Sequence, residues 1–275
     1  MPSATPLAVV TGGARGIGAA TARRFAKLGH AVGVLDVNAE LGTALAAQLT
    51  AEGSQAVFIA CDVSDAAAVE AAAQSLEARF GAPRVLVTAA ALIPDTDSIL
   101  EMDLETHDRM WRVNYHGSVH AARSFGRRMV AAAQGGAIVT LGSINSLAPM
   151  PLPAYNITKA AIARLTELLA LEMGPHGIRA NCVAPTYVMT DQLRARVDAG
   201  LRDLGRMMAV HALDDLPTPE DIADAIVFLC SPQARTITGV LLPVDAGWAG
   251  GVSYMTYAGG VPDIVRRAGR NVLGE

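Results

Sequence analysis

The stretch Thr11-Gly12-Gly13-Ala14-Arg15-Gly16-Ile17-Gly18 follows a short apolar run at 7–11 and opens a segment of helical spacing at 14–29. Glycine lets a backbone turn tightly and approach a ligand closely. The free N–H groups at a helix N-terminus attract an anion. A strand, this glycine spacing and a helix, in that order, predict a loop that holds the pyrophosphate of a dinucleotide in a doubly wound α/β fold.

Apolar runs rich in β-branched residues alternate with stretches of helical length through the rest of the chain. The sequence predicts strands at 7–11, 30–36, 56–62, 84–88, 136–143, 178–185 and 239–245, and helices at 14–29, 38–52, 65–80, 104–133, 154–174 and 219–230. Continuously apolar strands that alternate with helices are typical of a buried parallel sheet. We expect one Rossmann-type domain over 1–275, with a central parallel sheet of about seven strands flanked by helices on both faces.

The composition excludes several classes of protein. Apolar residues make up 51% and charged residues 17% of the 275 residues, which is too apolar for a disordered chain. No apolar run approaches the ~18 residues of a membrane span, and no basic segment precedes an apolar one at the N-terminus. The net charge of −4 argues against a nucleic-acid partner. Cys61, Cys182 and Cys230 form no metal-ligand or disulfide pattern, so we expect a cytoplasmic protein without a metal.

Two segments lie outside the alternation of strands and helices. Residues 186–215 are mixed-polar and follow a strand end, where an insertion can form a substrate lid or simply an extra pair of surface helices. Residues 246–275 form a tail with Trp248, Tyr254 and Tyr257. These aromatic residues could line a pocket or a subunit interface, or could only cover the chain's own core.

The second predicted strand ends at Asp36, 18 residues after Gly18. A carboxylate at this position can accept hydrogen bonds from both hydroxyls of an adenosine ribose, and it repels a 2′-phosphate. Asp36 therefore predicts NAD(H) rather than NADP(H). In the other interpretation Asp36 is the N-cap of the next helix, and Arg15 could contact the extra phosphate of NADP(H).

Tyr155 and Lys159 stand four residues apart near the start of a predicted helix, so their side chains share one face. A free tyrosine has a pKa of ~10 and is a weak base at neutral pH, but a neighbouring cation stabilises the phenolate. Ser143 ends a predicted strand at the edge where parallel sheets bind ligands, and Ser146 is a rival for its role. Asn114 lies inside a predicted long helix, where an asparagine indicates a kink or a bound water.

Taken in order, the glycine loop, Asp36, Asn114, Ser143 and the Tyr155/Lys159 pair resemble the short-chain dehydrogenase/reductase family over about residues 5–248. Further stretches carry the resemblance: Asp62-Val63, Asn181 to Pro185, Pro-Glu-Asp-Ile-Ala at 219–223 and Thr-Gly…Pro-Val-Asp-Ala-Gly-Trp at 238–248. The resemblance implies that Tyr155 is the general acid/base and that Lys159 lowers its pKa and holds the nicotinamide ribose. It also implies that Ser143 polarises the reacting oxygen and that Asn114 anchors a water in a proton relay.

The resemblance also implies a set of residues around NAD(H). The expected cofactor contacts are Gly12, Arg15, Gly16, Ile17, Gly18, Asp36, Asp62, Val63, Ala89, Ala90, Tyr155, Lys159, Pro185, Thr186, Val188 and Thr190. The chain departs from the family where Thr88-Ala89-Ala90-Ala91 replaces Asn-Asn-Ala-Gly, so that side-chain hydrogen bonds bracing the sheet are lost or replaced by Thr88. It departs again at Pro185-Thr186, which replaces Pro-Gly and places a hydroxyl near the nicotinamide carboxamide.

Residues next to the catalytic set are candidates for the substrate pocket. They are Ile93, Pro94, Ile144, Asn145, Met150, Leu152, Tyr187, Met189 and Leu193. The set is mostly apolar and has no arginine beside Ser143 or Tyr155, although Arg194 and Arg196 could reach in from the insertion. This mixture favours a neutral secondary alcohol or ketone.

The sequence therefore predicts an NAD-dependent oxidoreductase that interconverts a secondary alcohol and a ketone. One alternative is an NADPH-dependent 3-oxoacyl carrier-protein reductase, against which Asp36 argues. The other is a protein that senses NAD without turnover, against which the intact Ser143, Tyr155 and Lys159 argue. The resemblance also implies a homo-oligomer, most often a homotetramer, in which the last strand and the tail lie at a subunit contact.

Overall fold

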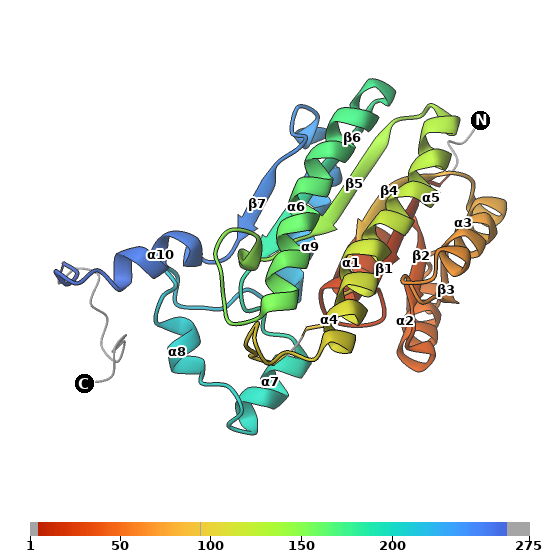
Figure 1. The fold of residues 1–275 in the computed structure, drawn as a ribbon. Helices are drawn as coiled ribbons and strands as arrows, with labels where there is room; N and C mark the ends of the chain where they lie inside the picture. Colours follow the sequence, from red (N-terminus) through yellow and green to blue (C-terminus); the bar gives the residue numbers. More distant parts are fainter. Residues whose placement is uncertain (1–4, 94, 263–275) are drawn as a thin grey trace.

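Seven parallel strands form one sheet in the order β3-β2-β1-β4-β5-β6-β7 (Figure 1). The strands are β1 (Leu7–Thr11), β2 (Ala31–Asp36), β3 (Ala56–Ala60), β4 (Pro83–Thr88), β5 (Gly136–Leu141), β6 (Ile178–Pro185) and β7 (Leu241–Val244). This computed structural model describes residues 5–93 and 95–262, so Pro94 and the tail beyond residue 262 lie outside the described residues. The strand order reverses between β1 and β4, and ligands bind at such a reversal in open parallel sheets.

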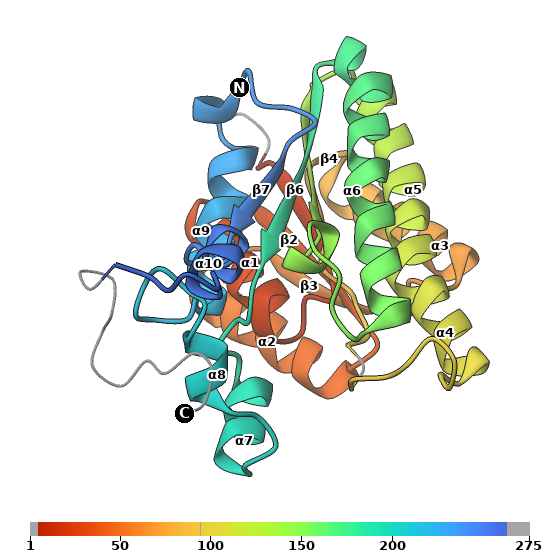
Figure 2. The same ribbon diagram turned by 60° about the vertical axis from the view of Figure 1, so that its left-hand side comes forward.

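Helices cover both faces of the sheet (Figure 2). One face carries α1 (Gly16–Lys27), α2 (Ala39–Ala51) and α9 (Pro219–Cys230), and the other carries α3 (Ala66–Phe80), α5 (Gly117–Ala132) and α6 (Pro153–Met173). Shorter helices are α4 (Leu104–Met110), α7 (Asp191–Asp198), α8 (Leu204–Met208) and α10 (Trp248–Met255), with 3₁₀ turns at Ile144–Ser146, Gly174–His176 and Pro232–Ala234. Among the described residues, each helix is either too short or too polar to span a bilayer.

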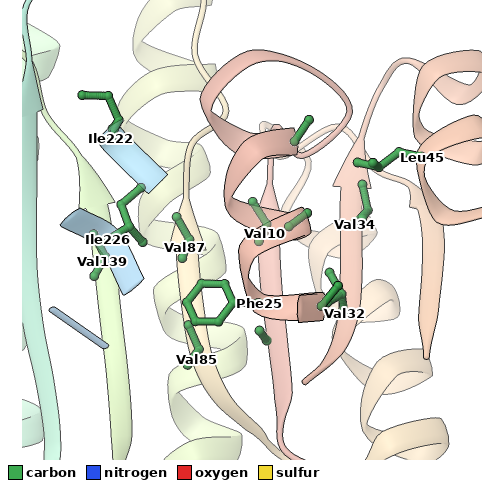
Figure 3. Close-up of a cluster of buried hydrophobic side chains, with 14 of the residues drawn as sticks. Val10, Phe25, Val32, Val34, Leu45, Val85, Val87, Val139, Ile222 and Ile226 are labelled. Atoms are coloured by element: carbon green, nitrogen blue, oxygen red, sulfur yellow. The ribbon is translucent and has the colours of Figure 1, made fainter. Parts of the chain in front are cut away.

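Alternate residues of each central strand enter opposite layers of the core. On β1, Val10 packs in the cluster with Phe25 of α1 and Ile226 of α9 (Figure 3). Its neighbour Val9 packs in the second cluster, with Phe125 of α5. Burying each such side chain contributes about 1.5–3 kcal/mol. Both faces of the sheet are buried, which explains why the strands are continuous apolar runs. The predicted doubly wound fold is confirmed.

The predicted helix at 104–133 is interrupted by a π-helical turn at Trp111–His116, between α4 and α5. Asn114 lies in this turn and is fully buried. The prediction of an irregularity at Asn114 is confirmed. A π turn within an α-helix is rare and occurs frequently at functional sites.

The insertion at 186–215 folds into α7 and α8, which lie beyond the carboxyl ends of the strands (Figure 1). No residue of α7 is buried, whereas α8 buries Met207. The insertion is therefore a pair of short helices at the ligand-binding edge, and its action as a lid stays a prediction. In the tail, Trp248 is buried in α10, whereas Tyr254 and Tyr257 are exposed.

Candidate active site

The glycine loop between β1 and α1 passes very close to other backbone. Gly12 has a φ of +63°, and a Cβ there would stand 2.6 Å from the Cα of Ala90, just past the end of β4. A Cβ on Gly18 would overlap the carbonyl oxygen of Gly12. Gly12 therefore lets the loop lie against the segment after β4, at the reversal of strand order, and Gly18 lets α1 pack against the loop.

Helix α1 begins at this loop without a side-chain cap from a described residue. In contrast, the side chains of Asn38, Asp65 and Thr218 accept hydrogen bonds from the first turns of α2, α3 and α9. The first N–H groups of α1 are thus left for an anion, and the helix dipole favours a negative charge there. Gly16, with a φ of +54°, keeps this approach open except toward Thr190, whose methyl carbon lies 3.5 Å from the Cβ position.

Asp36 ends β2 beside the same loop. Its Oδ2 accepts a hydrogen bond from the N–H of Ala14 at 3.0 Å, and its Oδ1 accepts one from the N–H of Asn38 at 2.9 Å. Asn38, not Asp36, is the N-cap of α2, because its side chain accepts from the N–H of Leu41. The interpretation of Asp36 as a helix N-cap is therefore wrong. The carboxylate ties the glycine loop to β2.

Asn114 connects the segment after β4 with the helix that carries Tyr155. Its Oδ1 accepts from the N–H of Leu92 at 2.8 Å, and its Nδ2 donates to the carbonyl oxygen of Leu92 at 3.1 Å. The same Nδ2 lies 3.4 Å from Oγ1 of Thr158, which donates to the carbonyl oxygen of Tyr155. The buried amide of Asn114 thus pairs with both the N–H and the carbonyl oxygen of Leu92, as the backbone of a neighbouring β-strand would.

Ser143 and its rival Ser146 make different contacts. The Oγ of Ser143 accepts hydrogen bonds from the backbone N–H of Asn145 at 3.2 Å and from its Nδ2 at 3.0 Å. A hydrogen bond with Ser143 also acts to lower the pKa of Tyr155. Ser146 Oγ instead donates to the carbonyl oxygen of Lys159 at 2.7 Å and accepts from the N–H of Ser143. The serine that faces the phenol is therefore Ser143, whereas Ser146 braces the turn.

Tyr155 and Lys159 are both buried, one turn apart on α6. Burial raises the pKa of Tyr155 to about 12, against the opposing hydrogen bond of Ser143. Burial also lowers the pKa of Lys159 to about 8. Lys159 Nζ lies 5.4 Å from the centroid of the Tyr155 ring and donates to the carbonyl oxygen of Leu141 at 2.7 Å. The expectation of a lowered pKa for Tyr155 is contradicted, because burial outweighs the opposing hydrogen bond of Ser143.

The segment after β4 departs from the expected bracing. Thr88 Oγ1 is buried and has no hydrogen-bond partner among the described residues. Thr88 therefore does not replace the lost side-chain hydrogen bonds. Instead Thr11 holds the segment: its carbonyl oxygen accepts from the N–H of Ala89 at 3.1 Å, and its Oγ1 lies 3.5 Å from the N–H of Ala90.

Several of the remaining candidate residues make contacts away from Ser143 and Tyr155. Asp62 accepts from the N–H and hydroxyl of Ser64, and Val63 packs where a Cβ on Gly117 would stand. Arg196 Nη2 pairs with Asp95 Oδ1 at 2.6 Å, so this guanidinium is engaged by a loop carboxylate rather than directed at Ser143. Ile93 is mostly exposed.

Met110 is one contact that the sequence interpretation missed. It forms a small buried cluster with Ala154 and Tyr155, packed by Leu92 and Leu152. The available signal was its position four residues before Asn114, on the same helix face. Among the described residues, no three His, Cys, Asp or Glu side chains gather as metal ligands do.

Comparison with known proteins places this geometry in a family. A family model described as "Enoyl-(Acyl carrier protein) reductase" matches residues 12–249. The chain is 39% identical over 246 residues to galactitol 2-dehydrogenase of Rhizobium johnstonii, covering 88% of this chain and 94% of that protein. It is 35% identical over 248 residues to D-threitol dehydrogenase of Mycolicibacterium smegmatis, covering 88% and 92%.

Solved structures agree with these sequence relatives. An oxidoreductase of the short-chain dehydrogenase/reductase family from Burkholderia thailandensis superposes with a TM-score of 0.84 at 31% identity, covering 94% of this chain and 98% of that one. The matched residues 12–249 include the glycine loop, Asn114, Ser143, Tyr155 and Lys159. The chain belongs to the short-chain dehydrogenase/reductase family of oxidoreductases.

Proposed function

We propose that this protein is an NAD(H)-dependent dehydrogenase that interconverts a secondary alcohol and a ketone. The observation that carries the proposal is the burial of Tyr155 and Lys159 on one face of α6, beside Ser143 at the carboxyl edge of β5. The glycine loop after β1 and Asp36 at the end of β2 lie at the same edge of the sheet, two and three strands away from β5.

The residues present fit a nicotinamide dinucleotide. The uncapped first turn of α1 would hold the pyrophosphate, and the Gly16 position leaves room for it. Asp36 would accept the adenosine ribose hydroxyls, since two hydrogen bonds leave some of the ~four lone-pair sites of a carboxylate free. When bound, the nicotinamide ring supplies the two-electron chemistry at the substrate carbon.

The side chains of this protein would handle the proton and the substrate oxygen. Tyr155, with a pKa of about 12, holds its proton at neutral pH and would donate it to the oxygen of a ketone. Ser143 accepts two hydrogen bonds from Asn145, and its own O–H, which bonds with Tyr155 in this structure, would donate to the same substrate oxygen. In the oxidative direction Tyr155 must first lose its proton. The neighbouring Lys159, whose pKa burial lowers to about 8, changes its charge near that pH.

Lys159 would also hold the nicotinamide ribose. Asn114, whose amide fixes the buried π turn beside α6, would anchor a water that links Lys159 to solvent, as the resemblance implies. The expected cofactor contacts around this core stay as the sequence predicts them, as do the substrate contacts Asn145, Met150, Leu152, Tyr187 and Met189.

A polyol or a related secondary alcohol is the substrate class that we favour. The side chains that pack with Tyr155, including Met110 and Leu152, are neutral, and Arg196 is engaged by Asp95. The similarity to proteins named as galactitol and D-threitol dehydrogenases supports this class. The description of the matching family model names an acyl carrier protein, and an NADPH-dependent 3-oxoacyl carrier-protein reductase stays the second candidate.

We also propose a homo-oligomer, with a homotetramer as the first choice. Strand β7 is an edge strand, and an edge strand offers unpaired backbone groups to another chain. The exposed Tyr254 and Tyr257 follow it in the tail. A cytoplasmic location stays a prediction.

A panel of substrates tests the proposed function. Secondary alcohols, including galactitol and threitol, are offered with NAD⁺ or NADP⁺, and reduced cofactor is followed by absorbance. We expect turnover of at least one neutral alcohol with NAD⁺. Turnover confined to a 3-oxoacyl substrate with NADPH would support the second candidate instead.

A further inference from the structure

An open cavity of about 730 Å³ lies at the amino ends of the strands, at the edge of the sheet opposite Ser143. Its lining includes Arg84 near the start of β4, Gly136 at the start of β5 and Arg179 near the start of β6. Strand β5 leads from Gly136 toward Ser143, so at ~3.3 Å per residue the two lie roughly 20 Å apart. The cavity is therefore separate from the active site, and its volume is in the range of small-molecule sites.

The side chains that carry a full charge at pH 7 in this cavity are all arginines. Arg84, Arg179 and Arg235 line it, and no Asp or Glu is among its lining residues. Burial lowers the pKa of His30, a fourth nitrogen-bearing side chain of the lining, so this imidazole is neutral at pH 7. A chain of net charge −4 thus gathers three positive charges at one place. An anion between them would relieve their mutual repulsion.

Arg179 is a fixed guanidinium that is bound by backbone carbonyls instead of a carboxylate. Its Nη1 donates to the carbonyl oxygens of Leu229 at 2.5 Å and Ile237 at 3.2 Å, and its Nη2 donates to that of Ser231 at 3.2 Å. These bonds leave some of the guanidinium donors free. Burial lowers the pKa of Arg179, and the group that opposes this change is the Cys230 thiol. A partly buried charge without a counter-charge is unfavourable, so an anionic ligand would stabilise it.

Arg84 and Arg235 keep their guanidinium groups free. Within the part of the chain that the structure describes, neither side chain forms a hydrogen bond or an ion pair. In contrast, Arg128 pairs with Glu70 at 2.8 Å on another face of the molecule. Arg84 is partly buried and Arg235 is exposed, so the two can close on a ligand from the inner and outer sides of the cavity.

We propose that this cavity binds a small organic phosphate, with the phosphate held by Arg84, Arg179 and Arg235. Guanidinium groups match the oxygens of a phosphate in pairs. A phosphate monoester, whose second pKa is ~6, is largely a dianion at pH 7 and balances three arginines better than a single carboxylate does. Phe80 and Pro232 also line the cavity and offer apolar surface to the organic part of the ligand. This site does not depend on the proposed function.

Calorimetric titration with phenyl phosphate, in a phosphate-free buffer of low ionic strength, tests the proposal. We expect the wild type to bind it, and Arg84→Gln to bind it about tenfold or more weakly, as the loss of one charge-assisted hydrogen bond gives. Arg84→Lys should retain most of the affinity. Arg235→Gln repeats the test at an exposed side chain, where a folding defect is not expected. Arg164→Gln removes an exposed arginine of α6 outside the cavity and should leave the affinity unchanged.

Competition and analogue experiments distinguish this cavity from other anion sites. Phenyl phosphate should bind equally with and without NADH, because the glycine loop lies at the other edge of the sheet. Phenol should not bind, and benzoate, with one charge on the same ring, should bind more weakly. The proposal is overturned if the wild type does not bind phenyl phosphate, if both glutamine variants keep the wild-type affinity, or if NADH displaces the probe. Benzoate that binds as tightly as phenyl phosphate would overturn the assignment to a phosphate.

Discussion

Replacement of Asp36 by alanine removes one negative charge and two hydrogen bonds at the end of β2. The carboxylate accepts from the N–H of Ala14 at 3.0 Å and from that of Asn38 at 2.9 Å. The N–H of Ala14 is in the part-buried loop, and leaving such a donor unpaired costs about 1–3 kcal/mol. We therefore expect Asp36→Ala to lower the free energy of unfolding by about that amount.

The lost charge should have the larger effect on cofactor choice. The proposal places the 2′-phosphate of NADPH next to this carboxylate. Two unit charges ~6 Å apart interact with ~3 kcal/mol at an effective dielectric constant of ~20. Because ~1.4 kcal/mol is a tenfold change in affinity, this repulsion corresponds to about a hundredfold. Asp36 is only partly buried, so solvent and salt reduce the effect, and we expect about 10- to 100-fold.

The test is the ratio of the dissociation constants of NADPH and NADH, measured for the wild type and for Asp36→Ala. Asp36→Asn is the matched control, because it keeps the size and one acceptor oxygen but removes the charge. Both variants should move the ratio toward NADPH, and the change should shrink as salt is added. A ratio that neither variant changes would refute the ribose contact, and a wild type that prefers NADPH would refute the proposed cofactor.

Other residues give further tests. Gly18→Ala should lower the free energy of unfolding by about 1–3 kcal/mol or more and abolish dinucleotide binding, because the new Cβ overlaps the carbonyl oxygen of Gly12. Gly250→Ala, which has open space around its Cβ position, is the control in the thermal unfolding and binding assays. The ¹³Cε resonance of Lys159 should titrate near pH 8, with the exposed Lys27 as the second lysine signal; a midpoint above pH 10 would contradict the burial argument. Because the pKa of Lys159 is lower in the folded state, its contribution to stability should rise between about pH 8 and 10.5 and be absent in Lys159→Met, as pH-dependent urea unfolding can show.

The strands and helices were predictable because the burial of one or both faces of each element gives its apolar residues a regular spacing in the sequence. The strand at 178–185 and the helix at 219–230 have the predicted bounds. The glycine loop was predictable for a similar reason, since close backbone approach at Gly12 and Gly18 admits no side chain.

Features that depend on distant partners were not predictable. The exact π turn at Asn114 requires the backbone of Leu92, which lies 22 residues away. The pKa of Tyr155 depends on how completely the fold buries its ring, and periodicity gives no measure of that. The pairing of Arg196 with Asp95 joins residues 101 positions apart, and the contact between Thr186 and His211 joins residues 25 positions apart.

Tyr155→Phe tests most directly whether this phenol moves the proton. The substitution removes one oxygen from a buried ring and leaves the glycine loop and Asp36 untouched. NADH affinity should stay within about twofold, while turnover of any alcohol found in the panel should fall by ~10²–10⁴-fold, the usual contribution of a general acid or base. A variant that binds NADH and keeps tens of per cent of the wild-type rate would contradict the assignment of Tyr155.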